Sequence, residues 1–135
     1  MAVRAVRGAT QIDTDERDHV LERTREMVSE VMVGNQLDQD SIISIVFTAT
    51  QDVKSVAPAL AARQLGLNDP ALICVQEMHV EGAMPMLVRL VAHVETDLAA
   101  DQIRNVYLHG TERLRTGVPP IPLADEPGSG GRGRA

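Results

Sequence analysis

Apolar and polar residues alternate along several stretches of the chain, and this two-residue period predicts β-strands. Alternating stretches cover residues 2–10, 41–50 and 86–96, a β-rich run covers 71–78, and a short edge strand is predicted at 106–108. Gly8, Ala9 and Thr10 are expected to let the chain turn, which would leave Arg7 near the end of the first strand.

The two runs at 71–78 and 86–96 flank a connector with Gly82 and Pro85, a pattern typical of a β-hairpin with a long loop. One face of the second run carries Met86, Val88, Leu90, Ala92 and Val94. The other face carries Leu87, Arg89, Val91, His93 and Glu95. Arg89 is therefore predicted in the middle of a central strand, on its less apolar face.

Helical spacing of apolar residues replaces alternation after residue 13 and predicts a long amphipathic helix. Asp13 or Thr14 is expected to cap its start, since Asp13 and Glu16 have capping-box spacing. Gly34 and Asn35 are expected to end it in the left-handed conformation. A short second helix is predicted at 58–65. The buried stripe of the long helix is predicted to be Val20, Leu21, Thr24, Met27, Val28, Val31 and Met32.

These elements predict an α+β domain in which one long and one short helix are too few to cover both faces of the sheet. The apolar face of 41–50 is predicted to be Ile43, Ile45, Phe47 and Ala49. The uncovered face would carry Ser44, Val46, Thr48, Leu87, Arg89 and Val91. Such a mixed face suits contact with another subunit, so we expect a closed homo-oligomer with its sites where subunits meet.

Composition narrows the class of protein. The 135 residues suffice for one domain, expected at 1–115 and followed from 116 to 135 by a flexible Gly/Pro-rich tail. A net charge of −6 argues against nucleic acid as the partner. No apolar run is long enough to span a membrane, no secretory signal is visible, and the single cysteine, Cys74, fits a cytoplasmic location.

Candidate chemistry is sparse, because the four histidines are scattered and neither a glycine-rich phosphate loop nor a nucleophile elbow is present. The remaining candidates suit a small polyanion, since guanidinium groups bind carboxylates in pairs of hydrogen bonds. They are Arg7, Arg89, Arg115, Glu77 and Tyr107. Spacing alone leaves open a structural Glu77–Arg89 ion pair, an exposed Arg63 and a Cys74 buried as a small hydrophobic residue.

Several motifs in a fixed order resemble the short, monofunctional AroH-class chorismate mutases, over about residues 3–115. The motifs include Val6-Arg7-Gly8-Ala9-Thr10, Thr48-Ala49-Thr50-Gln51-Asp52, Pro58-Ala59, Ala61-Ala62-Arg63, Cys74-Val75-Gln76-Glu77-Met78, Arg89, Asp101-Gln102-Ile103-Arg104-Asn105-Val106-Tyr107-Leu108 and Leu114-Arg115. The resemblance implies a homotrimer of mixed five-stranded sheets, which form a pseudo-α/β barrel with active sites between subunits. It implies the rearrangement of chorismate to prephenate, a step in aromatic amino-acid biosynthesis, without cofactor or metal.

By the same resemblance, Arg89 would face the ether oxygen of chorismate and Glu77 would accept the hydrogen bond of the ring hydroxyl. Arg7 and Tyr107 would hold the side-chain carboxylate. The remaining substrate-binding positions implied by the family are Cys74 beside Glu77, the more peripheral Arg63 and Arg115, the latter as a mobile gate, and Ala59, Leu72 and Ile73.

The expected pocket mouth departs from the family pattern, and two alternative functions are considered. Family members often carry an aromatic residue at the position of Ala57 and a lysine at that of Leu60, so the expected pocket mouth is more open and less basic. A trimeric module that binds a small carboxylate without turning it over is the alternative to an isomerase. Trimers of the enamine/imine deaminase type, with a similar architecture, are a related enzymatic alternative.

Overall fold

The computed structural model describes residues 1–116 and 121–122. The strands are β1 (Ala2–Gln11), β2 (Ile42–Ala49), β3 (Ala71–Gln76), β4 (Leu87–Thr96) and β5 (Val106–Leu108). The helices are α1 (Arg17–Gly34), α2 (Ala59–Gln64) and the short α3 (Arg113–Thr116), with the 3₁₀ turns η1 (Gln39–Ser41) and η2 (Ala100–Gln102).

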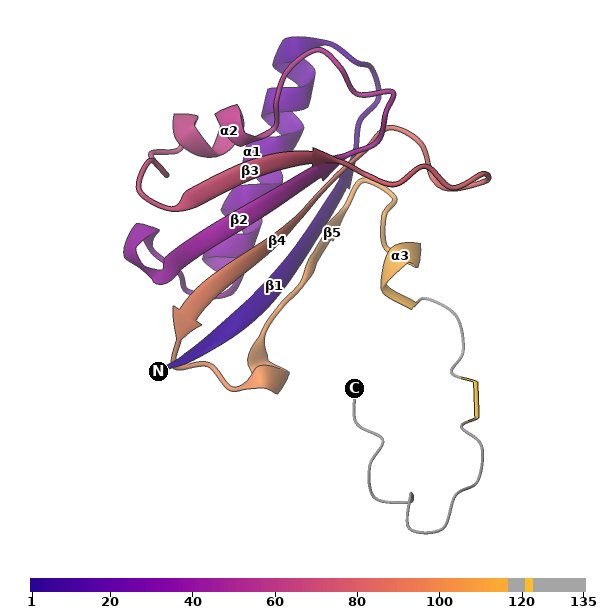
Figure 1. Ribbon diagram of the computed structural model, residues 1–135. Helices are drawn as coiled ribbons and strands as arrows, with labels where there is room; N and C mark the ends of the chain where they lie inside the picture. The colour runs from indigo at the N-terminus through magenta and orange to yellow at the C-terminus, as the bar shows by residue number, and fades with distance from the viewer. Residues whose placement is uncertain (117–120, 123–135) are drawn as a thin grey trace.

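The five strands form one mixed sheet in the order β3-β2-β4-β1-β5 (Figure 1). β4 lies at the centre and runs antiparallel to both β1 and β2. The two edge strands run parallel to their neighbours, β3 to β2 and β5 to β1. The expected mixed five-stranded sheet with one long and one short helix is therefore confirmed.

The predicted hairpin between β3 and β4 is wrong, because β2 lies between these two strands. A parallel connection through α2 returns the chain beside β2 and makes β3 an edge strand. The following connector then carries the chain past β2, and the Asp52 carboxylate accepts the Met86 N–H at 3.1 Å where β4 begins. Met86 has a positive φ of 54°, so the chain bends sharply there.

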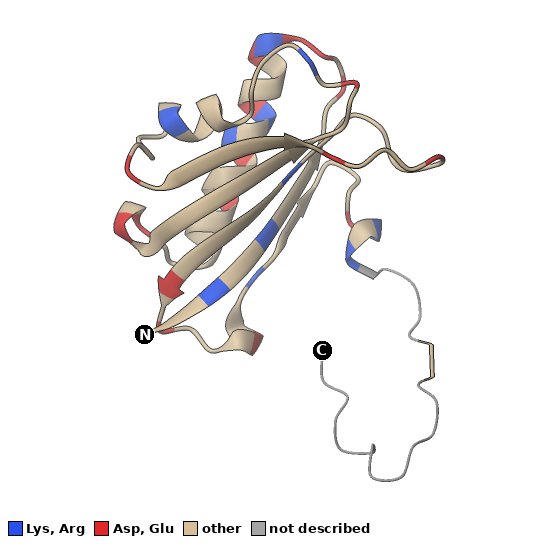
Figure 2. Cartoon of the chain, viewed as in Figure 1, with Lys and Arg blue, Asp and Glu red and all other residues tan. Residues whose placement is uncertain are grey.

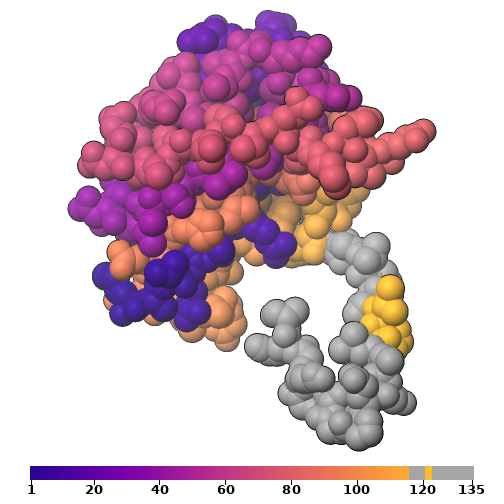
Figure 3. All heavy atoms as spheres, viewed as in Figure 1, coloured from indigo at the N-terminus to yellow at the C-terminus, as the bar shows by residue number. Residues whose placement is uncertain are grey.

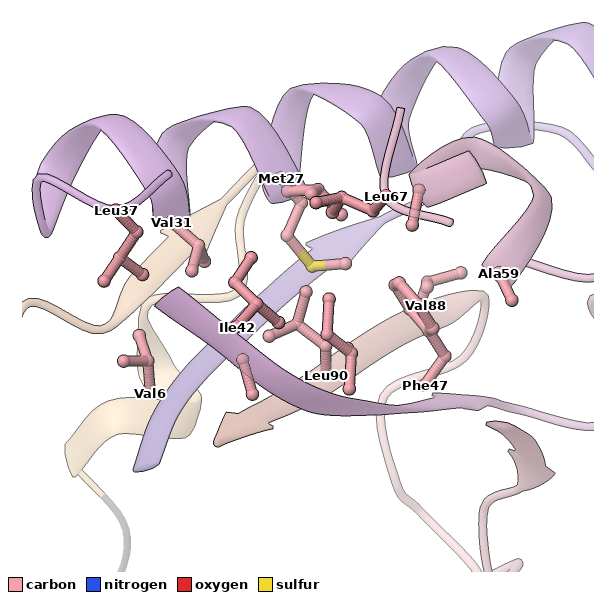
Figure 4. Close-up of a cluster of buried hydrophobic side chains, with 14 of the residues drawn as sticks. Val6, Met27, Val31, Leu37, Ile42, Phe47, Ala59, Leu67, Val88 and Leu90 are labelled. Carbon is pink, nitrogen blue, oxygen red and sulfur yellow. The ribbon is translucent and has the colours of Figure 1, made fainter. Parts of the chain in front are cut away.

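The hydrophobic core lies between the sheet and the two main helices, which pack on the same face (Figures 1 and 4). The predicted stripe of α1 is buried except for Met32, which is partly buried. Figure 4 shows Met27 of α1 pointing toward Leu90 of β4, near Phe47 of β2. A Cβ at Gly8 would lie 3.2 Å from the Met27 side chain, so glycine permits this close packing. Gly8 is thus not a turn residue, and β1 continues to Gln11.

Both ends of α1 differ from the prediction. The helix begins after Glu16, and the Asp13 carboxylate binds Arg23 at 2.8 Å instead of capping the helix. Asp15 accepts backbone hydrogen bonds from Lys54 and Ser55 in the loop after β2, so its side chain is not available to cap the helix either. At the other end, Gln36 rather than Gly34 or Asn35 is left-handed, with φ 55°.

A register irregularity near Ile43 changes the face prediction for the start of β2. Ile42 and Ser44 pair with consecutive residues of β4, so Ile43 is bulged out. Ile42 is consequently buried and Ile43 is exposed, the reverse of the expected order. Leu87, expected on the uncovered face, is also buried.

Neither α1 nor α2 covers the other face of the sheet, which we call the open face; it faces the viewer in Figures 1 to 3. Figure 2 shows that its strands are mostly uncharged, with basic positions on β1. Val3, Ile73 and Val75 on this face are 59%, 56% and 41% exposed. Figure 3 shows that the connector between β3 and β4 projects from the body of the molecule.

No helix among the described residues is long and apolar enough to cross a membrane. The predicted tail after residue 115 lies mostly outside the described residues. The division of the chain into a domain and a tail stays a prediction.

Candidate active site

A cavity of about 220 Å³ opens on the open face, near the end of the sheet where β1 and β2 finish. Strands β1, β2, β4 and β5, the residue after β3, and α3 all contribute to its lining. The polar side chains that line it are Arg7, Thr48, Glu77, Arg89 and Tyr107, and Leu114 adds an apolar one. Four of the predicted site residues therefore meet in one place, namely Arg7, Glu77, Arg89 and Tyr107.

Strand pairing explains why these side chains converge. Arg89 of central β4 lies opposite Thr48 on one side and opposite Ala9 on the other. Tyr107 of β5 is level with Ala9 in the parallel ladder. Because side chains at paired positions share a face of the sheet, Thr48, Arg89 and Tyr107 all project from the open face. Arg7 lies two residues before Ala9 and projects the same way.

Glu77 reaches the same cavity from the opposite edge of the sheet. Its backbone N–H donates to the Ala49 carbonyl at 2.9 Å, which extends the β2–β3 ladder by one residue beyond β3. This bond fixes the direction of its side chain. The Glu77 side chain is 17% exposed, and that of Arg89 is 41% exposed.

Glu77 and Arg89 form a two-pronged ion pair at the centre of the site. Arg89 Nε donates to Glu77 Oε1 at 2.8 Å, and the Arg89 Nη2 donates to Oε2 at 2.6 Å. The Thr48 hydroxyl adds a third hydrogen bond, to Oε1 at 2.8 Å. The ion pair that spacing alone left open is thus present, and it lies inside the cavity.

This ion pair keeps both groups charged. The hydrogen bonds from Arg89 lower the pKa of Glu77 below its ordinary value, although partial burial acts in the opposite direction, and Thr48 lowers it further. The hydrogen bonds to Glu77 raise the pKa of Arg89. At neutral pH the cavity therefore holds a fixed anion beside a fixed cation.

The ion pair does not use all the hydrogen-bond donors of Arg89, which lines the cavity. A guanidinium has five N–H donors, and Glu77 takes only two of those on Arg89. The remaining donors can bind an oxygen atom of a ligand that carries negative charge. Arg7 adds a second guanidinium, and its backbone is fixed by a 2.8 Å hydrogen bond to the Asn105 side chain.

The other predicted site residues lie outside this cavity. Cys74 pairs with buried Phe47, so its thiol lies on the helix-covered side, where it accepts the Ala59 N–H at 3.3 Å. Cys74 and Glu77 therefore point to opposite faces. Cys74 is exposed at the sheet edge, which corrects its expected burial. Arg63, Leu72 and Ile73 lie on α2 and β3 at the same edge.

Arg115 lies in α3 and lines a different hollow, near Asn105 and Arg104. Its neighbour Leu114 lines the cavity instead. Thr48 and Leu114 were not predicted as site residues. Thr48 was placed on the mixed face of its strand, but its contact with Glu77 depends on strand pairings that the hairpin prediction got wrong.

The described residues contain no group of three or more His, Cys, Asp or Glu side chains able to hold a metal ion. The site thus consists of two arginines, a carboxylate, a phenol and a threonine hydroxyl, on the face of a mixed sheet that α1 and α2 leave uncovered. Residues 3–118 match the family model described as chorismate mutase type I, and the chain belongs to this family.

Individual relatives agree with this assignment. The chain is 34% identical over 116 residues to the protein named chorismate mutase AroH of Bacillus subtilis strain 168, with 85% of this chain and 91% of the relative covered. It is 34% identical over 114 residues to chorismate mutase AroH of Thermus thermophilus, with 84% and 93% covered. The solved structure of chorismate mutase from Clostridium thermocellum matches with a TM-score of 0.80 at 37% identity and covers 82% of this chain and 98% of that chain. The resemblance drawn from the motifs is confirmed.

Proposed function

We propose that this member of the chorismate mutase type I family converts chorismate to prephenate in the cavity around Arg89. One observation beyond family membership carries the proposal. Two arginines, an ionised carboxylate and a phenol line a single cavity on the open face, and Glu77 takes only two of the five N–H donors of Arg89. This set matches a substrate with two carboxylates, an ether oxygen and a ring hydroxyl.

The reaction is intramolecular, so the protein has only to bind, orient and stabilise. The C–O bond of the enol ether breaks as a C–C bond forms, and no proton or electron is exchanged with the protein. Because C–O cleavage runs ahead, negative charge develops on the ether oxygen. A cation fixed beside that oxygen binds the transition state more tightly than the substrate, which lowers the barrier.

Arg89 is the residue proposed to face the ether oxygen. Glu77 accepts hydrogen bonds from the Nε and Nη2 of Arg89, so the guanidinium is oriented before the substrate binds. Little reorganisation is then needed during the reaction. Glu77 in turn is proposed to accept the hydrogen bond of the ring hydroxyl. Its lowered pKa keeps it an acceptor at neutral pH.

Arg7 and Tyr107 are proposed to bind the side-chain carboxylate of chorismate. They lie on adjacent strands, β1 and β5, at the side of the cavity away from Glu77. Carboxylate binding there and hydroxyl binding at Glu77 would hold the compact conformer in which the reacting carbons are close. Such positioning removes an entropic part of the barrier.

We propose further that three copies of the chain assemble and that each site is completed by a neighbouring copy. Exposed apolar residues on the open face favour burial against another subunit. The family positions absent from the cavity cluster at the α2–β3 edge, so a neighbour could present them across the open face. These positions are Ala59, Arg63, Leu72, Ile73 and Cys74.

The proposed activity is tested by incubating the protein with chorismate, acidifying, and reading the ultraviolet absorbance of phenylpyruvate. We expect turnover well above the uncatalysed rate. Arg17→Ala is a matched control for substitutions of the cavity arginines. Arg17 is exposed at the start of α1, and it does not line the cavity. Binding of chorismate without product would favour the alternative of a carboxylate-binding module and refute the enzyme.

The proposed assembly is tested separately by sedimentation of the protein over a range of concentrations. We expect activity to follow the trimeric fraction. A fully active monomer would contradict the completion of each site by a neighbour, although it would leave the proposed reaction intact.

A further inference from the structure

Thr48 contributes a hydroxyl at the centre of the cavity, from a strand that supplies none of the residues assigned above. It lies directly opposite Arg89 in the β2–β4 ladder, and its hydroxyl donates to Glu77 Oε1 at 2.8 Å. A side chain branched at Cβ has few allowed χ1 rotamers, so the direction of the Thr48 hydroxyl is restricted by the strand backbone. The contact joins β2 to the residue that follows β3.

The hydrogen bonds to Glu77 can be counted atom by atom. An ionised carboxylate offers about four lone-pair positions, two on each oxygen. Oε1 accepts from Thr48 and from Arg89 Nε, so both of its positions are used. Among the described residues, Oε2 accepts a hydrogen bond from Arg89 Nη2 alone, so one of its positions is left for a ligand. This pattern favours Oε2 as the atom that accepts the hydrogen bond of the substrate hydroxyl.

Without Thr48, Arg89 would be the one side-chain donor to the Glu77 carboxylate among the described residues. Arg89 is also the group proposed to stabilise charge on the ether oxygen, so any adjustment of its guanidinium toward that oxygen would turn the carboxylate with it. A donor from a different strand separates the two tasks, because it fixes one carboxylate oxygen independently of Arg89.

We propose that Thr48 is a positioning residue for the rearrangement: its hydroxyl occupies Glu77 Oε1 and thereby directs Oε2 at the hydroxyl of the substrate. This inference rests on the proposed function and deepens it. Thr48 acts through Glu77.

The test compares Thr48→Val, which removes the hydroxyl but keeps the branched shape, with Thr48→Ser, which keeps the hydroxyl. In Thr48→Val, Glu77 Oε1 keeps its hydrogen bond from Arg89 Nε, so the substitution leaves neither carboxylate oxygen unpaired. Ser44→Ala is the matched control, since it removes a hydroxyl from the same strand and face but outside the cavity, where Ser44 contacts His93 at 3.3 Å. Sedimentation and thermal unfolding establish that each variant folds and assembles.

We expect Thr48→Val to reduce kcat/KM on chorismate by roughly tenfold to a hundredfold, the range for a hydrogen bond to a charged group. Thr48→Ser should recover most of the loss, and Ser44→Ala should stay within about twofold of wild type, as expected for a change away from the site. Because the Thr48 bond lowers the pKa of Glu77, the acid limb of the pH profile of kcat/KM should move to higher pH in Thr48→Val.

Carboxyl-carbon NMR of the unliganded protein measures the same pKa of Glu77 without substrate. A Thr48→Val protein with wild-type kcat/KM and an unchanged Glu77 pKa would overturn the inference. So would a Thr48→Ser protein as impaired as Thr48→Val, because the hydroxyl would then not be the cause. Inactivity of the wild type would refute the proposed function instead, so the two failures are distinguishable.

Discussion

Replacing Arg89 by alanine is expected to reduce turnover far more than it reduces stability. The substitution removes both prongs of the ion pair and leaves Glu77 with the Thr48 hydrogen bond. Breaking a fully buried pair costs about 3–5 kcal/mol, whereas exposed pairs contribute about 1 kcal/mol or less. The Arg89 side chain is 41% exposed and that of Glu77 is 17% exposed, so we expect a loss between these limits, of about 1–2 kcal/mol.

The catalytic loss should be larger, because Arg89 is the group proposed to meet charge that exists only in the transition state. Removing one preoriented donor from such a site typically lowers kcat by about 10²–10³-fold, or about 2.7–4 kcal/mol. KM should change less than kcat, since Arg7 and Tyr107 would still bind the substrate carboxylate. Arg89→Lys keeps a positive charge but not the planar fork, so it should recover only part of the loss.

The assay follows the loss of the ultraviolet absorbance of chorismate at saturating substrate, and denaturant unfolding gives the stability of each variant. Both measurements are needed, because an unfolded variant would lose activity whether or not Arg89 acts in the reaction. If folded Arg89→Ala retains kcat within about threefold of wild type, far from the loss expected for a transition-state donor, the role assigned to Arg89 is wrong.

Three further predictions concern stability. Above pH 4.5, the ordinary carboxyl pKa, the wild type should have a larger free energy of unfolding than Glu77→Gln, because ionised Glu77 pairs with Arg89. This difference should shrink as the pH falls through the lowered pKa of Glu77 in the folded protein. A difference that does not depend on pH would contradict the ion-pair explanation. Asn35→Ala should lose about 2–4 kcal/mol in denaturant unfolding, since it removes three hydrogen bonds of a buried side chain, whereas exposed Asn68→Ala should change little. Gly66→Ala should lower the melting temperature, because φ is 93° and the new Cβ would lie 2.7 Å from a neighbouring side chain; Gly34→Ala, which meets nothing within 4 Å, should be neutral or stabilising.

The sequence predicted best those features that depend on neighbours along the chain. Alternation through residues 86–96 placed Arg89 correctly on the less apolar face of the central strand, since the side-chain period of a strand is fixed. The stripe of α1 was read equally directly from its helical spacing. Each of these signals repeats over several turns or pleats, so one exceptional residue does not hide it.

Strand pairing was predicted poorly, because it depends on residues far apart in sequence. Nothing in the connector between β3 and β4 indicates that the chain skips past β2. The small residues Ala61 and Ala62 are fully buried in α2, which lets this helix pack closely in the core before the chain enters β3 beside β2. Likewise, the run Ile42-Ile43-Ser44 offers no local sign of a bulge, which shows itself only in the register with β4.

The candidate site shows the same contrast between features set by neighbours along the chain and features set by long-range strand pairing. Arg89 and Glu77 were singled out from the sequence as an acid and a base on β-rich segments, and the structure brings them together. The roles given to Arg7 and Tyr107 came from the family resemblance, because strands β1 and β5 lie far apart in the chain. Thr48 stood in a quoted motif without a role, since its importance depends on facing Arg89 and reaching Glu77.

The position of β1 inside the sheet constrains how the chain can be made. Among the described strands, β1 pairs with β4 and β5, which are synthesised well after it because they lie at Leu87–Thr96 and Val106–Leu108. Until then its apolar residues have no partner strand, and such delayed, long-range pairing slows folding and exposes the nascent chain to aggregation. Helix α1 packs on β1 and is synthesised directly after it, so it can shelter these residues before β4 is available.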